Sequence, residues 1–165
     1  MNNFPAHDWL TVFSTEASVG ATLTGLVFIA LSINLKQILE LPGLAGRAGE
    51  ALLLLMLPIL VGLAGVLPQT SLRPLGVEFV AIGLIEWALV TRILTSGRKP
   101  ARERPTHEFL LRCLGAELGV LPTIVAGGIL VAEHPAGLWW QAAGTAVAIV
   151  AGVGDAWILL VEILR

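Results

Sequence analysis

The chain is made of long apolar segments, and this feature limits its possible folds more than any other. Five predominantly apolar stretches follow one another along 165 residues. Each is close to the length of about 20 residues that a helix needs to cross a hydrocarbon core. The mean hydropathy of +0.84 and the charged fraction of 13% agree, because soluble domains carry about 25% charged residues. We therefore expect an all-α protein that crosses a membrane several times.

We predict one transmembrane domain over residues 1–165, a bundle of five helices with almost no part outside the membrane. Charged segments and segments rich in Pro and Gly separate the spans, as expected for helix ends. The predicted spans cover residues 17–39, 51–67, 75–94, 109–132 and 138–164.

The basic residues predict the orientation of this bundle. Most of them lie in or beside a basic loop, residues 95–108, and others flank the loop between the first two spans. With five spans these positions share one side, which the positive-inside rule assigns to the cytoplasm. We therefore expect the N-terminus outside and the C-terminus in the cytoplasm. The basic loop should contact anionic lipid rather than nucleic acid, because no aromatic platform accompanies its charges.

Three spans contain an acidic residue well inside the apolar stretch. These residues are Glu86, Glu117 and Asp155, and Glu162 continues the face of Asp155 toward the cytoplasmic end. A charge at the centre of a membrane helix costs about 2.5–3.5 kcal/mol on insertion scales, so it is kept where something compensates it. Carboxylates at this depth are typical of ion and proton pathways. The four residues are therefore candidate ion- or proton-binding groups.

Arginines at a similar level support a second interpretation. Arg92 and Arg112 lie toward the cytoplasmic ends of the third and fourth spans. Either guanidinium could neutralise Asp155, Glu162 or Glu117 across helices. The carboxylates would then hold helices together instead of binding a cation or a proton. The sequence leaves both interpretations open.

Small residues mark the faces through which membrane helices approach one another. Such residues recur at helical spacing in the first, fourth and fifth spans, where packing is expected at Gly25, Gly115, Gly119, Gly127, Gly144 and Gly152. In the first span the stripe also contains Ser14, Ser18, Thr22 and Ser32, and a water-lined path along it is the alternative to packing. Glu117 points away from the glycine face of its span, which predicts helix partners on two sides.

Motifs for enzymes, metals and cofactors are missing from the sequence or incomplete. The segment Gly152-Val153-Gly154-Asp155 matches the Gly-x-Gly-Asp motif of intramembrane aspartyl proteases, whose chemistry needs two carboxylates that share a proton. The only other aspartate, Asp8, should lie outside the membrane. The histidines fall in separate loops without ligand spacing. We expect no enzymatic activity, no cofactor and no metal. The remaining acids near helix ends need no function: Glu16, Glu50, Glu78 and Glu108.

The segment from Ala21 to Leu35 resembles the first span of small, uncharacterised bacterial membrane proteins. Pro42-Gly43-Leu44 and Arg47-Ala48-Gly49-Glu50 are also similar to that group. Some of its members carry the description of modulator of the FtsH protease. The resemblance covers the first third of the chain. It implies a bacterial cytoplasmic (inner) membrane and a regulatory role, and it supplies no catalytic residues.

Two functions are therefore expected as alternatives. The first is a channel or transporter-like protein that handles a cation or a proton with its intramembrane carboxylates. The second is a regulatory or scaffold protein that acts through helix contacts. Its partners would be other membrane proteins, and in both cases a homo-oligomer is expected.

Overall fold

The computed structural model describes residues 8–41, 43–96 and 106–163, and within these ranges it contains six helices and no strand. The helices are α1 (Leu10–Ile33), α2 (Leu35–Glu40), α3 (Leu44–Val66), α4 (Leu72–Ser96), α5 (Thr106–Val131) and α6 (Ala136–Ile163). The all-α prediction is therefore confirmed. Most of the basic loop at 95–108 lies outside the described residues.

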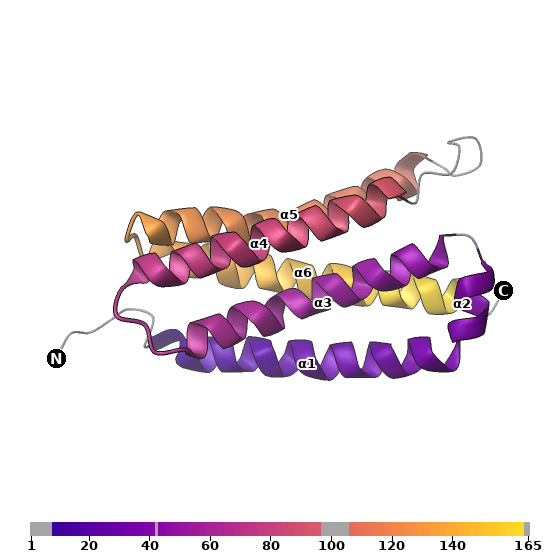
Figure 1. Ribbon diagram of the computed structural model, residues 1–165, viewed down its shortest axis with the longest axis horizontal. Helices are drawn as coiled ribbons and strands as arrows, with labels where there is room; N and C mark the ends of the chain where they lie inside the picture. Colours follow the sequence, from indigo (N-terminus) through magenta and orange to yellow (C-terminus); the bar gives the residue numbers. More distant parts are fainter. Residues whose placement is uncertain (1–7, 42, 97–105, 164–165) are drawn as a thin grey trace.

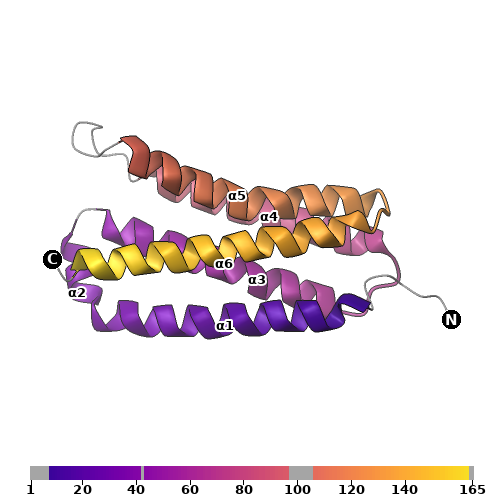
Figure 2. The same ribbon diagram turned by 180° about the vertical axis from the view of Figure 1, so that it is seen from behind.

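Five long helices lie side by side and run alternately in opposite directions along the molecule (Figure 1). α5 packs between α4 and α6, in agreement with the prediction that this helix has partners on two sides. α3 packs against α1, α4 and α6. α1 lies at the edge of the bundle, where its main neighbour is α3. The start of α1 and the end of α6 lie at opposite ends of the bundle (Figure 2). Five long helices in alternating directions produce that arrangement, because an odd number of them separates the two ends.

Four of the described helices are long and apolar enough to cross a membrane: α1, α3, α6 and the part Arg112–Val131 of α5. Many large apolar side chains on the outside of the bundle are exposed, for example Phe28 at 60% and Val150 at 73%. In water such a surface would be unfavourable, whereas lipid accommodates it. The fold is therefore that of a helical protein embedded in a membrane. α4, which carries the predicted span at 75–94, is not one of the four and contains four charged residues.

The first predicted span has different bounds in the structure. α1 begins at Leu10 instead of residue 17 and ends at Ile33, and the separate helix α2 follows. The break falls at Asn34, whose side-chain amide donates a hydrogen bond of 2.9 Å to the carbonyl of Ala30. Asparagine side chains compete in this way with the regular backbone bonds of a helix. α3 begins earlier than predicted because Gly43 adopts the left-handed φ of 89° and starts the helix directly.

Close helix contacts depend on glycines, since a Cβ there would collide with the neighbouring helix. Gly119 and Gly144 lie between α5 and α6, Gly127 between α4 and α5, and Gly152 between α3 and α6. Gly115 also faces α6, but a Cβ there would make an ordinary contact of 3.6 Å with Cβ of Ala151. At Gly127 a Cβ would lie 2.7 Å from the carbonyl oxygen of Gly76, a contact that side chains do not make. The backbones of α4 and α5 therefore approach closely at this point.

Gly25 differs from the other glycines that were expected at helix contacts. No described atom outside its own helix lies within 4 Å of the position of its Cβ. α1 packs on α3 through another face, where Phe13 occupies the space beside Gly65 and Gly20 meets Pro58. The stripe that contains Gly25 is therefore exposed over its length, including Ser14, Ser18, Thr22 and Ser32. Its hydroxyl groups donate hydrogen bonds to carbonyls of the preceding turn of α1.

Candidate intramembrane carboxylate sites

Arg47 joins α3 to α6 near the C-terminal end of α6. Its side chain is only 13% exposed, and its Nη1 lies 3.1 Å from Oε1 of Glu162. Its Nε lies 3.7 Å from Oδ1 of Asp155, which is also largely buried. Asp155 and Glu162 lie two turns apart on one face of α6, so a single guanidinium reaches both carboxylates. Both acids are therefore neutralised by an arginine of a neighbouring helix.

Arg112 joins α5 to α3 in the same region. Both its Nε and its Nη2 contact Oε2 of Glu50, whose side chain is fully buried. Asp155 also interacts electrostatically with Arg112, and Glu50 with Arg47. Two arginines and three acids from three helices thus form one connected cluster. A buried ion pair of this kind replaces the lost hydration of each charge with a partner.

Arg92 does not take part in this cluster. Its side chain is exposed on α4, and the ion pairs among the described residues do not include it. Arg92 was expected to neutralise an acid across helices, but its position on α4 turns it away from the interior, where Val90 and Leu94 of the same helix are buried. The partner of Asp155 and Glu162 is Arg47, which sequence reasoning treated only as a topology signal.

Glu117 has an aromatic partner instead of a charged one. It lies on the face of α5 opposite Gly115 and Gly119, and Nε1 of Trp87 on α4 donates a hydrogen bond of 3.0 Å to its Oε2. A tryptophan N–H is a donor without acceptor capacity, so this bond suits a carboxylate. Glu117 therefore contributes to the contact between α4 and α5.

Glu86 is a deeply buried acid without a hydrogen-bond partner in the described structure. It lies in the middle of α4, its side chain is 3% exposed, and neither carboxylate oxygen has a hydrogen-bond partner among the described residues. It shares a face with Gly83, which meets Ile124 of α5, and with Val90, which packs near Ala116 and Cys113. Buried carboxylates are normally paired, so a carboxylate of this kind is a candidate functional group.

The four predicted acids therefore do not share one site. Asp155 and Glu162 belong to the arginine cluster, Glu117 faces Trp87, and Glu86 lies alone in apolar surroundings. Over residues 8–41, 43–96 and 106–163, no group of three His, Cys, Asp or Glu side chains could hold a metal ion. A bound cation needs several oxygen ligands, whereas a proton needs one. This arrangement can bind protons more readily than metal cations.

Two buried acids were assigned no function from the sequence, because both fall near predicted helix ends. Glu50 is fully buried, and Glu16 on α1 is 9% exposed. Helical spacing could have indicated that Glu16 is buried. It lies three residues after Phe13 and four before Gly20, the two residues that pack on α3, and therefore shares their face of α1. The other buried polar residues among those described are uncharged: Thr123, Gln141 and Thr145.

The fold and these groups together define a class, the multi-pass helical membrane proteins with ionisable residues in the bundle interior. Comparison with protein-family models, with curated proteins and with solved structures finds no match to this chain. The function must therefore be argued from the residues themselves.

Proposed function

We propose that this protein handles protons in a membrane, as a small channel or transporter-like protein whose central proton-binding group is Glu86. One observation carries the proposal: the carboxyl group of Glu86 is buried in the middle of a helix and both of its oxygens lack a partner among the described residues. An ionised carboxylate in such a place is very unfavourable, and burial therefore favours the neutral acid. A group that is neutral at rest and can give up its proton is what a proton pathway requires.

The other acids have structural roles in this proposal. Asp155 and Glu162 face Arg47, and Glu50 faces Arg112, so their charges already have partners. Breaking such a pair leaves an unpaired buried charge, which makes these acids unsuitable for repeated protonation and release. The sequence predicted a site for a cation or a proton at four acids. We now propose a proton as the ligand and Glu86 as the acid that binds it.

The proposal includes five spans, with α4 as the fifth, the N-terminus outside and the C-terminus in the cytoplasm. α4 is 25 residues long and lies along α5 (Figure 1). Its charged residues at the two ends, Arg73 and Arg92, are exposed, where long side chains can reach the headgroups. We place the protein in a bacterial inner membrane, in keeping with the resemblance of its first span, and expect its basic loop at anionic lipid.

Purified protein in liposomes tests this function. With a pH gradient across the membrane and a pH-sensitive dye inside, we expect a proton flux that Glu86→Gln abolishes. The matched control is Glu78→Gln on the same helix, because Glu78 already accepts a hydrogen bond from Gln69. The control should retain the flux. Equal fluxes for the Glu86→Gln variant and the unmodified protein would refute the proposal.

The exposed stripe on α1 favours a second candidate, a regulatory or scaffold protein that binds other membrane proteins or a second copy of itself. Among the described atoms none covers Gly25, and the hydroxyls along the stripe are exposed. Small residues on a lipid-facing helix permit close approach of a further helix. Gly25→Leu should then abolish crosslinking in native membranes, whereas Gly154→Leu, at another open position, should not. No change in crosslinking with Gly25→Leu would exclude this candidate.

A further inference from the structure

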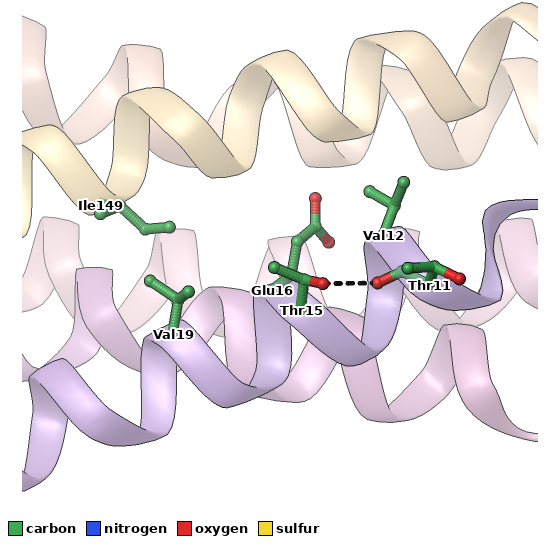
Figure 3. A pocket seen from close by; sticks show the side chains of 6 residues that line it. All are labelled: Thr11, Val12, Thr15, Glu16, Val19 and Ile149. Atoms are coloured by element: carbon green, nitrogen blue, oxygen red, sulfur yellow. Dashed lines mark hydrogen bonds between the residues drawn. The ribbon is translucent and has the colours of Figure 1, made fainter.

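A pocket between α1 and α6 contains an acid that the proposed function does not use. The pocket has a volume of about 280 Å³ and opens on the outside of the bundle. It is lined by Thr11, Val12, Thr15, Glu16, Val19 and Ile149. Its wall is apolar apart from a few oxygens, and the carboxylate of Glu16 points from α1 toward α6 (Figure 3). The pocket lies along the first turns of α1, so in a membrane it opens near the headgroups at that end of the bundle.

Glu16 has neighbours on α6 that can position it. Thr145 lies beside the carboxyl group of Glu16, and Nε2 of Gln141 donates a hydrogen bond of 2.7 Å to Oγ1 of Thr145. Because Gln141 donates to the Thr145 oxygen, the Thr145 hydroxyl is left to donate to Glu16. Gln141 and Thr145 are fully buried, so water does not compete for these bonds. The hydroxyl group of Thr145 can therefore orient the carboxyl group of Glu16.

One oxygen of Glu16 is unpartnered. Oε2 is buried and has no hydrogen-bond partner among the described residues. Ion pairs within the described chain do not involve Glu16, and its neighbours on α6, Thr145 and Ile149, are uncharged. Pro58 and Ile59 of α3, which meet Gly20 one turn further along α1, are uncharged too. A buried carboxylate that has an unpartnered oxygen and no positive charge beside it can take up a proton on that oxygen.

Thr123 lies between this group and the helix of Glu86. Its Cγ2 would be 3.5 Å from a Cβ on Gly83 of α4, and its backbone nitrogen 3.6 Å from a Cβ on Gly144 of α6. Gly83 is one helical turn from Glu86, and Gly144 adjoins Thr145. Oγ1 of Thr123 is buried and also unpartnered within the described residues. Each of the four helices α1, α6, α5 and α4 thus contributes a buried polar group to this part of the bundle.

We propose that Glu16 is a second proton-binding carboxyl, reached from the pocket between α1 and α6, positioned by Thr145 and Gln141, and located on the outer side of Glu86. The inference rests on the proposed function, because it places Glu16 on the pathway that ends at Glu86. Protons would enter at Glu16 and pass toward Glu86 past the hydroxyls of Thr145 and Thr123. Each transfer moves a proton between oxygens and needs no other reactant.

An apolar carbodiimide tests the state of Glu16 independently of flux. Such a reagent dissolves in the membrane and reacts with neutral carboxyl groups: the O–H of the acid adds across one C=N bond, and the O-acylisourea rearranges to a stable N-acylurea. After treatment with dicyclohexylcarbodiimide in liposomes, peptide mass spectrometry should find the whole reagent attached to Glu16. Glu133, exposed on the loop between α5 and α6, provides the control, because an ionised acid in contact with water should remain unmodified. Lack of modification at Glu16 would overturn the inference.

Flux measurements test whether Glu16 acts on the pathway of Glu86. Glu16→Gln should abolish the proton flux. Thr145→Val and Gln141→Leu each remove one positioning bond and should slow the flux about fivefold, the usual effect of one lost hydrogen bond. If Glu16→Gln leaves the flux intact while Glu86→Gln abolishes it, this inference is wrong and the proposed function stands. If Glu86→Gln has no effect, the proposed function itself is wrong, and the modification experiment still reports on Glu16.

Discussion

Arg112 on α5 holds the carboxylate of Glu50 on α3, and this carboxylate is completely buried. The pair joins two helices that otherwise have few contacts with each other. Arg47 connects the same region to α6. Arginines therefore neutralise the acids near the C-terminal end of α6, while Glu86 and Glu16 lie apart from them. This division separates acids that hold the bundle together from the acids that carry protons in the proposed function.

Removing Arg112 should destabilise the protein strongly. Arg112→Leu leaves Glu50 buried without a partner, and losing one member of a buried pair costs about 3–5 kcal/mol. Thermal unfolding in detergent measures the loss. Arg92→Leu, at an exposed position outside the ion pairs, should change the stability by about 0.5 kcal/mol or less.

The double variant Arg112→Leu/Glu50→Leu separates the charge from the packing. Replacing both partners with apolar residues is often neutral, so most of the lost stability should return. If the double variant is as unstable as Arg112→Leu alone, the unpaired charge of Glu50 is not the cause of the lost stability.

Glycine substitutions should distinguish the packed faces from the exposed stripe on α1. Gly127→Ala places a methyl group against the backbone of Gly76 and should cost about 1–3 kcal/mol. Gly25→Ala meets no described atom and should be neutral or stabilise α1 by about 1 kcal/mol, because alanine favours the helix. Unfolding of both variants in detergent gives the comparison. A similar loss at both positions would contradict the packing of α4 on α5.

The fold class follows from the sequence because apolar length and periodicity are local properties. The bounds of α4, α5 and α6 lie within about three residues of the predicted spans, whereas α3 begins at Leu44 instead of residue 51. The first predicted span differs from α1 at both ends, because the limits of α1 depend on tertiary contacts and on one side chain. Residues 10–16 look polar, yet Phe13 and Glu16 pack into the bundle, and Asn34 ends α1 by bonding to Ala30.

The candidate site could be predicted only in part. Depth along a helix follows from the sequence, so Glu86, Glu117 and Asp155 could be recognised as intramembrane acids. Their partners depend on helix rotation and on neighbour choice, which one sequence does not reveal. Arg47 lies near a predicted loop and was therefore taken as a topology signal, but α3 starts early enough to carry it into contact with Asp155.

Asp155 should be dispensable for proton flux. Asp155→Asn keeps the size of the side chain and removes the charge that faces Arg47, so it should lower stability while folded protein in liposomes retains its flux. Comparing flux per correctly folded molecule with the thermal midpoint separates the two effects. If Asp155→Asn lost its flux while its stability stayed unchanged, Asp155 would have to be part of the proton pathway.

Five spans can be tested by labelling single cysteines in a Cys113→Ala background. Thr70 and Glu133 are exposed in the loops at one end of the bundle, and Gln37 is exposed on α2 at the other end (Figure 1). With the N-terminus outside, Thr70→Cys and Glu133→Cys should react with a membrane-impermeant maleimide in intact cells. Gln37→Cys should react only after the membrane is opened. The same labelling pattern for Thr70→Cys and Gln37→Cys would contradict the five-span arrangement.

The protonation state of Glu86 is the most direct test of the central claim. Infrared spectra of the protein in lipid should contain the C=O stretch of a neutral carboxylic acid, and this band should shift in heavy water because the proton exchanges. The band assigned to Glu86 should disappear in Glu86→Gln and persist in Glu78→Gln. A spectrum in which Glu86→Gln removes no neutral-acid band, or removes one that does not shift in heavy water, would contradict the account.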